Sequence, residues 1–188
     1  MIVKPQILDL SCPALIDKAL KGIQDHLTAK LSWLNYAFGK SEKQIDSDGN
    51  VYPAIYQGFN NYINMLPDSH LGNYCFFEVE DGQDITRLSD YTVNDNKYQA
   101  DFNLIFWFDF REVYEDHERK TIENVKEDVL AALIAANLYG VSLEVTQIYD
   151  RAENIYQGYD HDEINRQFTK RPYGGFKLKG VINYWGNC

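Results

Sequence analysis

Cysteine is scarce in this sequence, and the three that occur, Cys12, Cys75 and Cys188, lie far apart. They form neither a disulfide framework nor the close spacing of a zinc site, so we expect the chain to work in a reducing compartment. No run of about 18 apolar residues occurs, and we therefore expect no membrane-spanning helix. The first residues also lack the layout of a signal peptide.

Positive charge is in short supply as well. The chain has 18 Lys and Arg residues against 28 Asp and Glu residues, which gives a formal net charge of −10. Binding to nucleic acid or to an anionic membrane requires clustered cations that neutralise phosphates, so this balance argues against both classes of partner. The one basic concentration lies near the C-terminus, over residues 170–179.

Motifs that carry chemistry are missing too. The sequence has no phosphate loop, no dinucleotide fingerprint and no nucleophile elbow. The segment 46–50 resembles a calcium loop, but it lacks the glycine at the sixth position and the glutamate at the twelfth that such a loop needs. The segment 159–163 places His161 among carboxylates, a composition that is commoner in solvated loops than in metal sites. We expect no catalytic, cofactor-binding or metal-binding residues, and no enzymatic activity.

One enzymatic alternative stays open at this point. Pro67-Asp68 followed by Glu78-Val79-Glu80 partly matches the layout of restriction-like nucleases, although Glu80 stands where that layout has a lysine. A small metal-dependent hydrolase or nuclease that uses the Asp, Glu and His loops is therefore the alternative function. Metal-dependent thermal stabilisation that is lost on His161→Ala would support it.

Aromatic residues, by contrast, are abundant, and they dominate the segment 100–110. Alternate side chains of a β-strand point to opposite faces, so the regular alternation here predicts a long strand. One predicted face is almost wholly aromatic or aliphatic: Ala100, Phe102, Leu104, Phe106, Phe108 and Phe110. We expect the first helix to cover that face. The opposite face carries Ile105 and Trp107, and we expect it to lie nearer to a partner, with a second buried layer as the alternative.

The remaining segments predict two helices and several shorter strands. Amphipathic helices are expected over residues 12–38 and 121–136, the second capped by Thr121. Strands are expected at 51–56, 74–80, 141–145 and 176–184. Pro53 is expected to restrict the first of these to a sheet edge or a strand start, and Gly180 to mark a bulge in the last.

Two long polar segments separate these elements. We expect residues 81–99 to form a loop or an extended hairpin arm, and residues 149–171 a loop or a short helix. Because helices and strands do not alternate strictly, the predicted fold class is α+β. We expect a mixed or antiparallel sheet packed by two amphipathic helices, with long polar loops or arms, in a single domain over residues 1–188.

The order of these elements resembles that of phage tail-terminator and tail-completion proteins. The likeness lies in the opening helix over 12–38, the proline-bearing segment 51–56, the strand 100–110 that leads into the helix 121–136, and the closing aromatic strand 176–185. It covers most of the chain at the level of element order. The polar segments 81–99 and 149–171 are longer than that family's pattern.

The resemblance implies a non-enzymatic virion protein that forms a ring of identical copies at the head–tail junction. Portal, connector or tail proteins would be its neighbours, DNA would pass through the ring without specific binding, and the protein would be made in the host cytoplasm and end in the virion. A host-side binding module is a further alternative. The expected residues of the interface between copies are Ile105, Trp107, Tyr156, Tyr159, Tyr173 and Trp185.

Overall fold

A computed structural model of the chain describes residue 5 and residues 12–67, 70–87, 96–136, 138–160 and 166–186. Its helices are α1 (Leu15–Lys30), α2 (Phe110–Val113), η1 (His117–Arg119), α3 (Ile122–Ile134), α4 (Ala152–Ile155) and η3 (Arg166–Thr169). Its strands are β1 (Tyr36–Lys40), β2 (Glu42–Ile45), β3 (Val51–Gly58), β4 (Asn61–Asn64), β5 (Tyr74–Val79), β6 (Asp84–Arg87), β7 (Asn96–Asp109), β8 (Val141–Tyr149) and β9 (Tyr173–Gly186).

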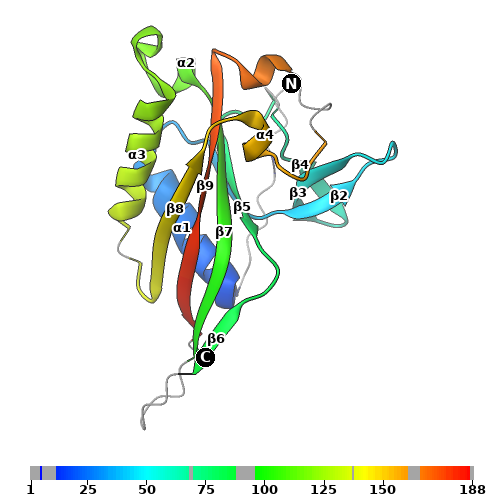
Figure 1. The fold of residues 1–188 in the computed structure, drawn as a ribbon, viewed down its shortest axis with the longest axis vertical. Helices are drawn as coiled ribbons and strands as arrows, with labels where there is room; N and C mark the ends of the chain where they lie inside the picture. Colours follow the sequence, from blue (N-terminus) through cyan, green and yellow to red (C-terminus); the bar gives the residue numbers. More distant parts are fainter. Residues whose placement is uncertain are drawn as a thin grey trace.

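The strands form two sheets (Figure 1). The main sheet has the order β1-β5-β7-β9-β8, and β6 extends it by pairing with the first residues of β7. β1 runs parallel to β5, whereas the other neighbours are antiparallel. The smaller sheet is the antiparallel set β2-β3-β4. The predicted α+β class with a mixed sheet is therefore confirmed.

The strand predicted over residues 100–110 is the centre of the main sheet. It is observed as β7, which has 14 residues and begins at Asn96. β9 pairs with it along its whole length, from Asn96 opposite Gly186 to Asp109 opposite Tyr173. Because β5 pairs with its other side, β7 is hydrogen-bonded along both edges over residues 102–107.

The aromatic face of β7 is covered by α1 and α3, as Figure 1 shows. The prediction that the first helix covers this face is confirmed. The α1 side chains buried against it lie along one stripe: Ile16, Ala19, Leu20, Ile23 and Leu27. Full burial of a Leu, Ile or Phe side chain contributes about 1.5–3 kcal/mol relative to exposure, so this layer is the main hydrophobic core.

The opposite face of β7 is covered by a second layer of the same chain. The β2-β3-β4 sheet, α4 and η3 pack there, and the cluster includes Phe38, Ile55, Met65, Phe76, Ile105, Trp107, Ile155, Tyr156 and Tyr159. Trp107 is 2% exposed and Ile105 is fully buried. The prediction that this face lies nearer to a partner is corrected here, because segments before and after β7 fold over it and remove it from solvent.

The first helix is shorter than predicted. α1 ends at Lys30, and Leu31 already has extended backbone angles. Leu31 and Leu34 are buried in the same core as α1, so their apolar spacing continues the helical pattern although a turn, not a helix, carries them. Gly39, the residue that follows the predicted helix, lies inside β1.

Pro53 does not restrict its strand to an edge. β3 is the middle strand of the smaller sheet, with β2 on one side and β4 on the other. The carbonyl of Pro53 accepts a hydrogen bond from the Met65 N–H at 2.8 Å, so its nitrogen faces the β4 side too. The register with β4 begins one residue later, at Ala54 opposite Asn64. Pro53 has no N–H to return a hydrogen bond to Met65, and the Met65 carbonyl accepts instead from the Tyr74 hydroxyl at 3.0 Å.

The two long polar segments are partly structured. Residues 84–87 and 96–99 pair as an antiparallel arm, which agrees with the hairpin-arm alternative for 81–99, and residues 88–95 lie outside the described part. The segment 149–171 contains α4 and η3, and residues 161–165 are outside the described part. The bulge predicted in the closing strand at Gly180 lies instead on its neighbour β8, where the register shifts between Val145, opposite Gly180, and Gln147. Among the helices that are described, none has the length and apolar character required to cross a membrane.

Candidate interaction surfaces

The six residues predicted to form an interface between copies occupy different environments. Trp107 stacks between Tyr74 and Tyr173, with ring centroids 5.7 and 5.2 Å away, and its indole N–H donates to the Phe168 carbonyl at 2.8 Å. Trp107 therefore ties the second layer to the main sheet. Tyr173 is partly buried beside it.

Ile105, Tyr156 and Tyr159 are buried within the same second layer. Together with Trp107, they leave almost no side-chain surface for a neighbouring copy, which corrects their assignment as contact residues. Sequence alternation shows that a strand has two apolar faces, but it does not show which distant segment covers each face. Of the six residues, Trp185 alone keeps a large exposed fraction, 37%.

A polar cluster joins the second layer to the end of the main sheet. The Tyr159 hydroxyl donates to Glu78 Oε1 at 2.5 Å, and the Asn103 Nδ2 donates to Glu78 Oε2 at 3.1 Å. Burial raises the pKa of the Glu78 carboxyl despite these hydrogen bonds and the nearby Lys177 ammonium. Burial likewise lowers the pKa of Lys177. The Tyr156 hydroxyl is also buried and has no hydrogen-bond partner among the described residues.

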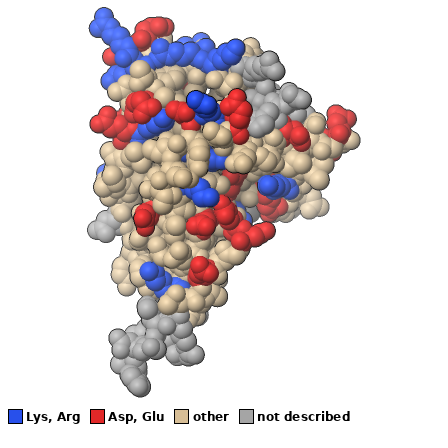
Figure 2. All heavy atoms as spheres, viewed as in Figure 1, with Lys and Arg blue, Asp and Glu red and all other residues tan. Residues whose placement is uncertain are grey.

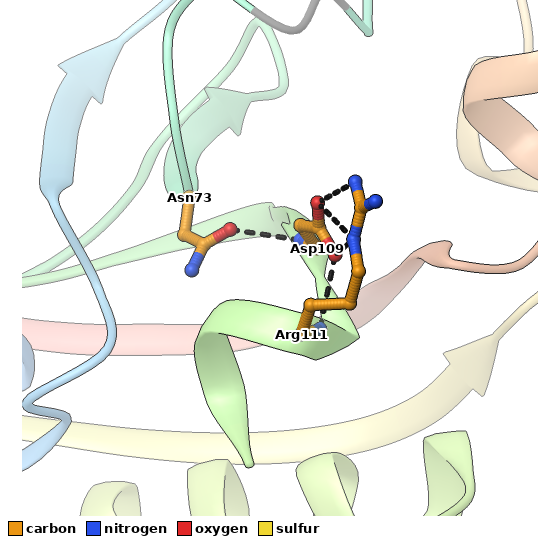
Figure 3. A network of polar contacts seen from close by, with 3 residues as sticks. All are labelled: Asn73, Asp109 and Arg111. Carbon is orange, nitrogen blue, oxygen red and sulfur yellow. Dashed lines mark hydrogen bonds and ion pairs between the residues drawn. The ribbon is translucent and has the colours of Figure 1, made fainter. Parts of the chain in front are cut away.

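A second polar network fixes the end of β7 where α2 begins (Figure 3). The Asn73 Oδ1 accepts from the Asp109 N–H at 2.8 Å, and the Asn73 Nδ2 donates to the Trp33 carbonyl at 3.0 Å. Asp109 is the N-cap of α2, accepts from the Arg111 N–H at 2.9 Å and pairs with the Arg111 guanidinium at 2.6 Å. Burial alone would raise the pKa of Asp109, but the Arg111 contacts outweigh it and hold that pKa below its ordinary value. The side chains of this network hydrogen-bond to one another and to nearby backbone groups, so we assign the network a structural role.

An exposed aromatic knob stands at the turn between β3 and β4. Phe59 is 94% exposed, and both turn residues, Phe59 and Asn60, have left-handed backbone angles (φ 52° and 61°). Tyr56 and Tyr62 pair behind it, with ring centroids 5.2 Å apart. The segment 57–62, Gln-Gly-Phe-Asn-Asn-Tyr, carries no charge. We call Phe59 with this segment the Phe59 knob.

A hollow of mixed polar and apolar surface lies between the start of α1, the α3–β8 connection and the end of β9. It encloses about 630 Å³, and its lining is Leu15, Lys18, Ala19, Gly22, Leu138, Tyr139, Gly140, Val141, Tyr184 and Trp185. Tyr139 is 95% exposed, and Leu15 is exposed with a positive φ of 50°. Among the lining residues Lys18 alone carries a charge. We call this site the Trp185 hollow.

The knob and the hollow lie on different parts of the molecule. Figure 1 places the β2-β3-β4 sheet on the right of the main sheet and the α3–β8 connection at the lower left. In Figure 2 the charged side chains crowd the upper half and the centre of this face, whereas the lower left carries few of them.

A groove of about 710 Å³ runs between α1 and the outer edge of β1. β1 ends the order of the main sheet, and no described strand pairs with its outer side. The Gln24 Nε2 donates to the Ala37 carbonyl on that edge at 2.8 Å. The helix thus covers part of the open edge with an amide that takes the place of a neighbouring peptide group.

No protein-family model and no curated protein matches this sequence. The functional interpretation therefore depends on the surfaces and clusters described above.

The segments considered as possible metal sites differ in how far the structure describes them. The Asp46 Oδ1 accepts from the N–H groups of Asp48 and Asn50 at 2.8 and 2.9 Å, the geometry of a hydrogen-bonded turn. Within the described residues no group of three or more His, Cys, Asp or Glu side chains is placed to hold a metal ion. His161 and Asp68, which the enzymatic alternative uses, lie outside the described part.

Sequence reasoning missed the knob and most of the hollow. No element is predicted between the strands 51–56 and 74–80, although Gly58 and Asn60 favour the positive φ angles of a tight hairpin turn. That signal would have located the turn, and with it the exposure of Phe59. The hollow has no comparable local signal, because three segments far apart in the sequence form it.

Proposed function

We propose that this protein is a structural virion component that forms a ring at the head–tail junction of a phage, as a tail terminator or a connector-like protein. The element order supports this, as does the distribution of exposed apolar surface. No enzymatic chemistry is part of the proposal.

The observation that carries the proposal is a pair of dissimilar surfaces with exposed aromatic side chains, the Phe59 knob and the Trp185 hollow, on separate parts of one chain. A ring requires a heterologous contact, in which one surface of a subunit meets a different surface of the next. Identical patches would instead favour a closed two-fold dimer. A convex patch and a concave patch at separate positions are what a heterologous contact needs.

Charge supports the same proposal. A chain with a net charge of −10 repels its own copies, so they associate most readily where the contacting surfaces are uncharged. An acidic ring would also repel DNA phosphates, and DNA would pass through it without specific binding. Portal, connector or tail proteins are the proposed neighbours above and below the ring.

The mass of the assembled protein tests this proposal. We expect native mass spectrometry and negative-stain images to show a closed ring of several copies, alone or with the proteins encoded beside it. The assembly should persist at high salt, since its contacts are apolar. A monomer under all these conditions would refute the proposed function.

The two alternatives predict different results. A metal-dependent hydrolase or nuclease would gain thermal stability with a divalent ion and lose that gain on His161→Ala. A host-side binding module would be encoded away from portal, capsid and tail genes. Flanking genes of those three kinds would support the ring instead.

A further inference from the structure

We infer that the Phe59 knob of one copy inserts into the Trp185 hollow of the next copy in the ring. This inference rests on the proposed ring assembly and names its contact. The occupant of the hollow is thus a second copy of this chain.

The knob is built at a conformational cost that the monomer does not need. The left-handed region costs a residue with a side chain about 1–2 kcal/mol, and two-residue hairpin turns of this kind favour Asn-Gly. Here a phenylalanine takes the first position, at φ 52°, with its ring in solvent. Strain combined with an exposed aromatic is a mark of a functional contact, since neither feature stabilises the isolated chain.

The hollow is shaped by small residues at its floor. A Cβ at Gly22, inside α1, would lie 3.8 Å from the Leu138 side chain, and a Cβ at Gly140 would lie 3.8 Å from the Trp185 ring. The two glycines leave the aliphatic and indole surfaces open. A phenylalanine ring that enters this space can pack against the rings of Trp185 and Tyr139, and aromatic pairs contribute about 0.5–1.5 kcal/mol beyond burial.

Charge argues for a second copy as the occupant. The knob segment has no charged residue of its own, but its Tyr62 hydroxyl donates to Glu42 Oε2 at 3.3 Å, and the lining of the hollow carries one charge, on Lys18. The carboxylate beside the knob of one copy would therefore approach a lysine of the next copy, which favours contact between two chains of net charge −10. Because the knob and the hollow lie on different parts of the molecule, each copy would use both, and the contact would continue from one copy to the next.

The first test is Phe59→Asn, which removes the ring but fits the left-handed turn better than phenylalanine does. We expect assembly to weaken by about tenfold or more, as for the loss of an interface hot spot. The melting temperature of the monomer should stay the same or rise, which separates lost contact from lost folding. The matched control is Ile45→Asn, another exposed apolar side chain of the same small sheet, and it should assemble like the wild type.

The second test is disulfide cross-linking between chains. A protein that carries F59C is mixed with one that carries Y139C, both with Cys12→Ser and Cys188→Ser to remove other thiols that could react. We expect a cross-linked pair of the two different chains under mild oxidation. A mixture of I45C and Y139C chains should give none.

The outcomes separate this inference from the proposed function. If the ring forms and Phe59→Asn assembles as well as the wild type, or if the I45C mixture cross-links equally, the knob-in-hollow contact is refuted and the ring stands. If the wild type never assembles, the proposed function fails and this contact fails with it.

Discussion

The buried Asn73 connects three segments of the fold through hydrogen bonds. It is fully buried, its side chain bridges the Trp33 carbonyl and the Asp109 N–H, and its own N–H donates to Asn35 Oδ1 at 2.7 Å. The segment before β1, the start of β5 and the end of β7 therefore meet at one side chain.

We expect Asn73→Ala to lower the free energy of unfolding by about 2–4 kcal/mol. The substitution leaves a carbonyl and an N–H buried without a partner, at about 1–3 kcal/mol each. Denaturant unfolding measures the loss. Asn61→Ala, which alters an exposed amide in β4, is the control and should change stability by about 0.5 kcal/mol or less. Equal effects of the two substitutions would contradict the structural role of the network.

Glu78 gives the stability a defined pH dependence. Burial raises the pKa of its carboxyl in the folded state, so the fold favours the protonated form. The contribution of this carboxyl to the free energy of unfolding is most favourable below its pKa in the unfolded chain. It declines as the pH rises through its pKa in the folded protein. Glu78→Gln keeps the shape and removes the charge.

The stability of Glu78→Gln relative to the wild type should therefore increase between about pH 4 and pH 7. Denaturant unfolding at both pH values measures this difference. Glu80→Gln is the control, because Glu80 is about half exposed and pairs with Lys179 at 3.3 Å near the surface. If the free energies of unfolding of Glu78→Gln and the wild type differ by the same amount at both pH values, burial does not disfavour the charged carboxylate.

Elements with a strong local pattern were predictable from the sequence. The alternation over residues 100–110 predicted β7, and the capping residue Thr121 with its apolar spacing predicted α3. The end of α1 was not predictable, since Leu31 and Leu34 enter the core from a turn with helical spacing. The central place of β3 was not predictable either, because the sequence does not show that the distant Tyr74 hydroxyl binds the Met65 carbonyl, to which Pro53 cannot donate.

Gly180 illustrates a glycine demanded by a close approach of two strands. A Cβ at this position would lie 2.1 Å from the carbonyl oxygen of Glu144 on β8. We expect Gly180→Ala to separate β8 from β9 around the bulge and to lower the free energy of unfolding by about 2 kcal/mol or more.

Thermal unfolding of the purified variant measures the effect of Gly180→Ala. Gly39→Ala is the control, since its Cβ would meet its nearest neighbour, the Gln24 amide, at 3.7 Å. That distance is an ordinary contact. A Gly180→Ala protein as stable as the wild type would show that β8 shifts without cost.

The molecule as a whole places its interior and its proposed contacts in different regions. The centre of the main sheet, at β5 and the second half of β7, is buried on both faces, by helices on one side and by a small sheet with short helices on the other. The sequence predicted the helical layer and left the second layer open as an alternative. It placed Trp185 among the contact residues, but the four residues that the second layer buries could be located only once the three-dimensional path of the chain was known.

The position of β7 has a consequence for the lifetimes of individual amide protons. Its residues 102–107 are hydrogen-bonded to β5 or β9 and lie between two packed layers, so solvent reaches these amides only when the whole domain opens. In hydrogen–deuterium exchange we expect them to be the slowest of the chain, at a rate set by global stability. The amides of the Phe59 turn should exchange within seconds in the monomer and more slowly after assembly. Faster exchange of the β7 amide protons than of the α3 amide protons would contradict this order.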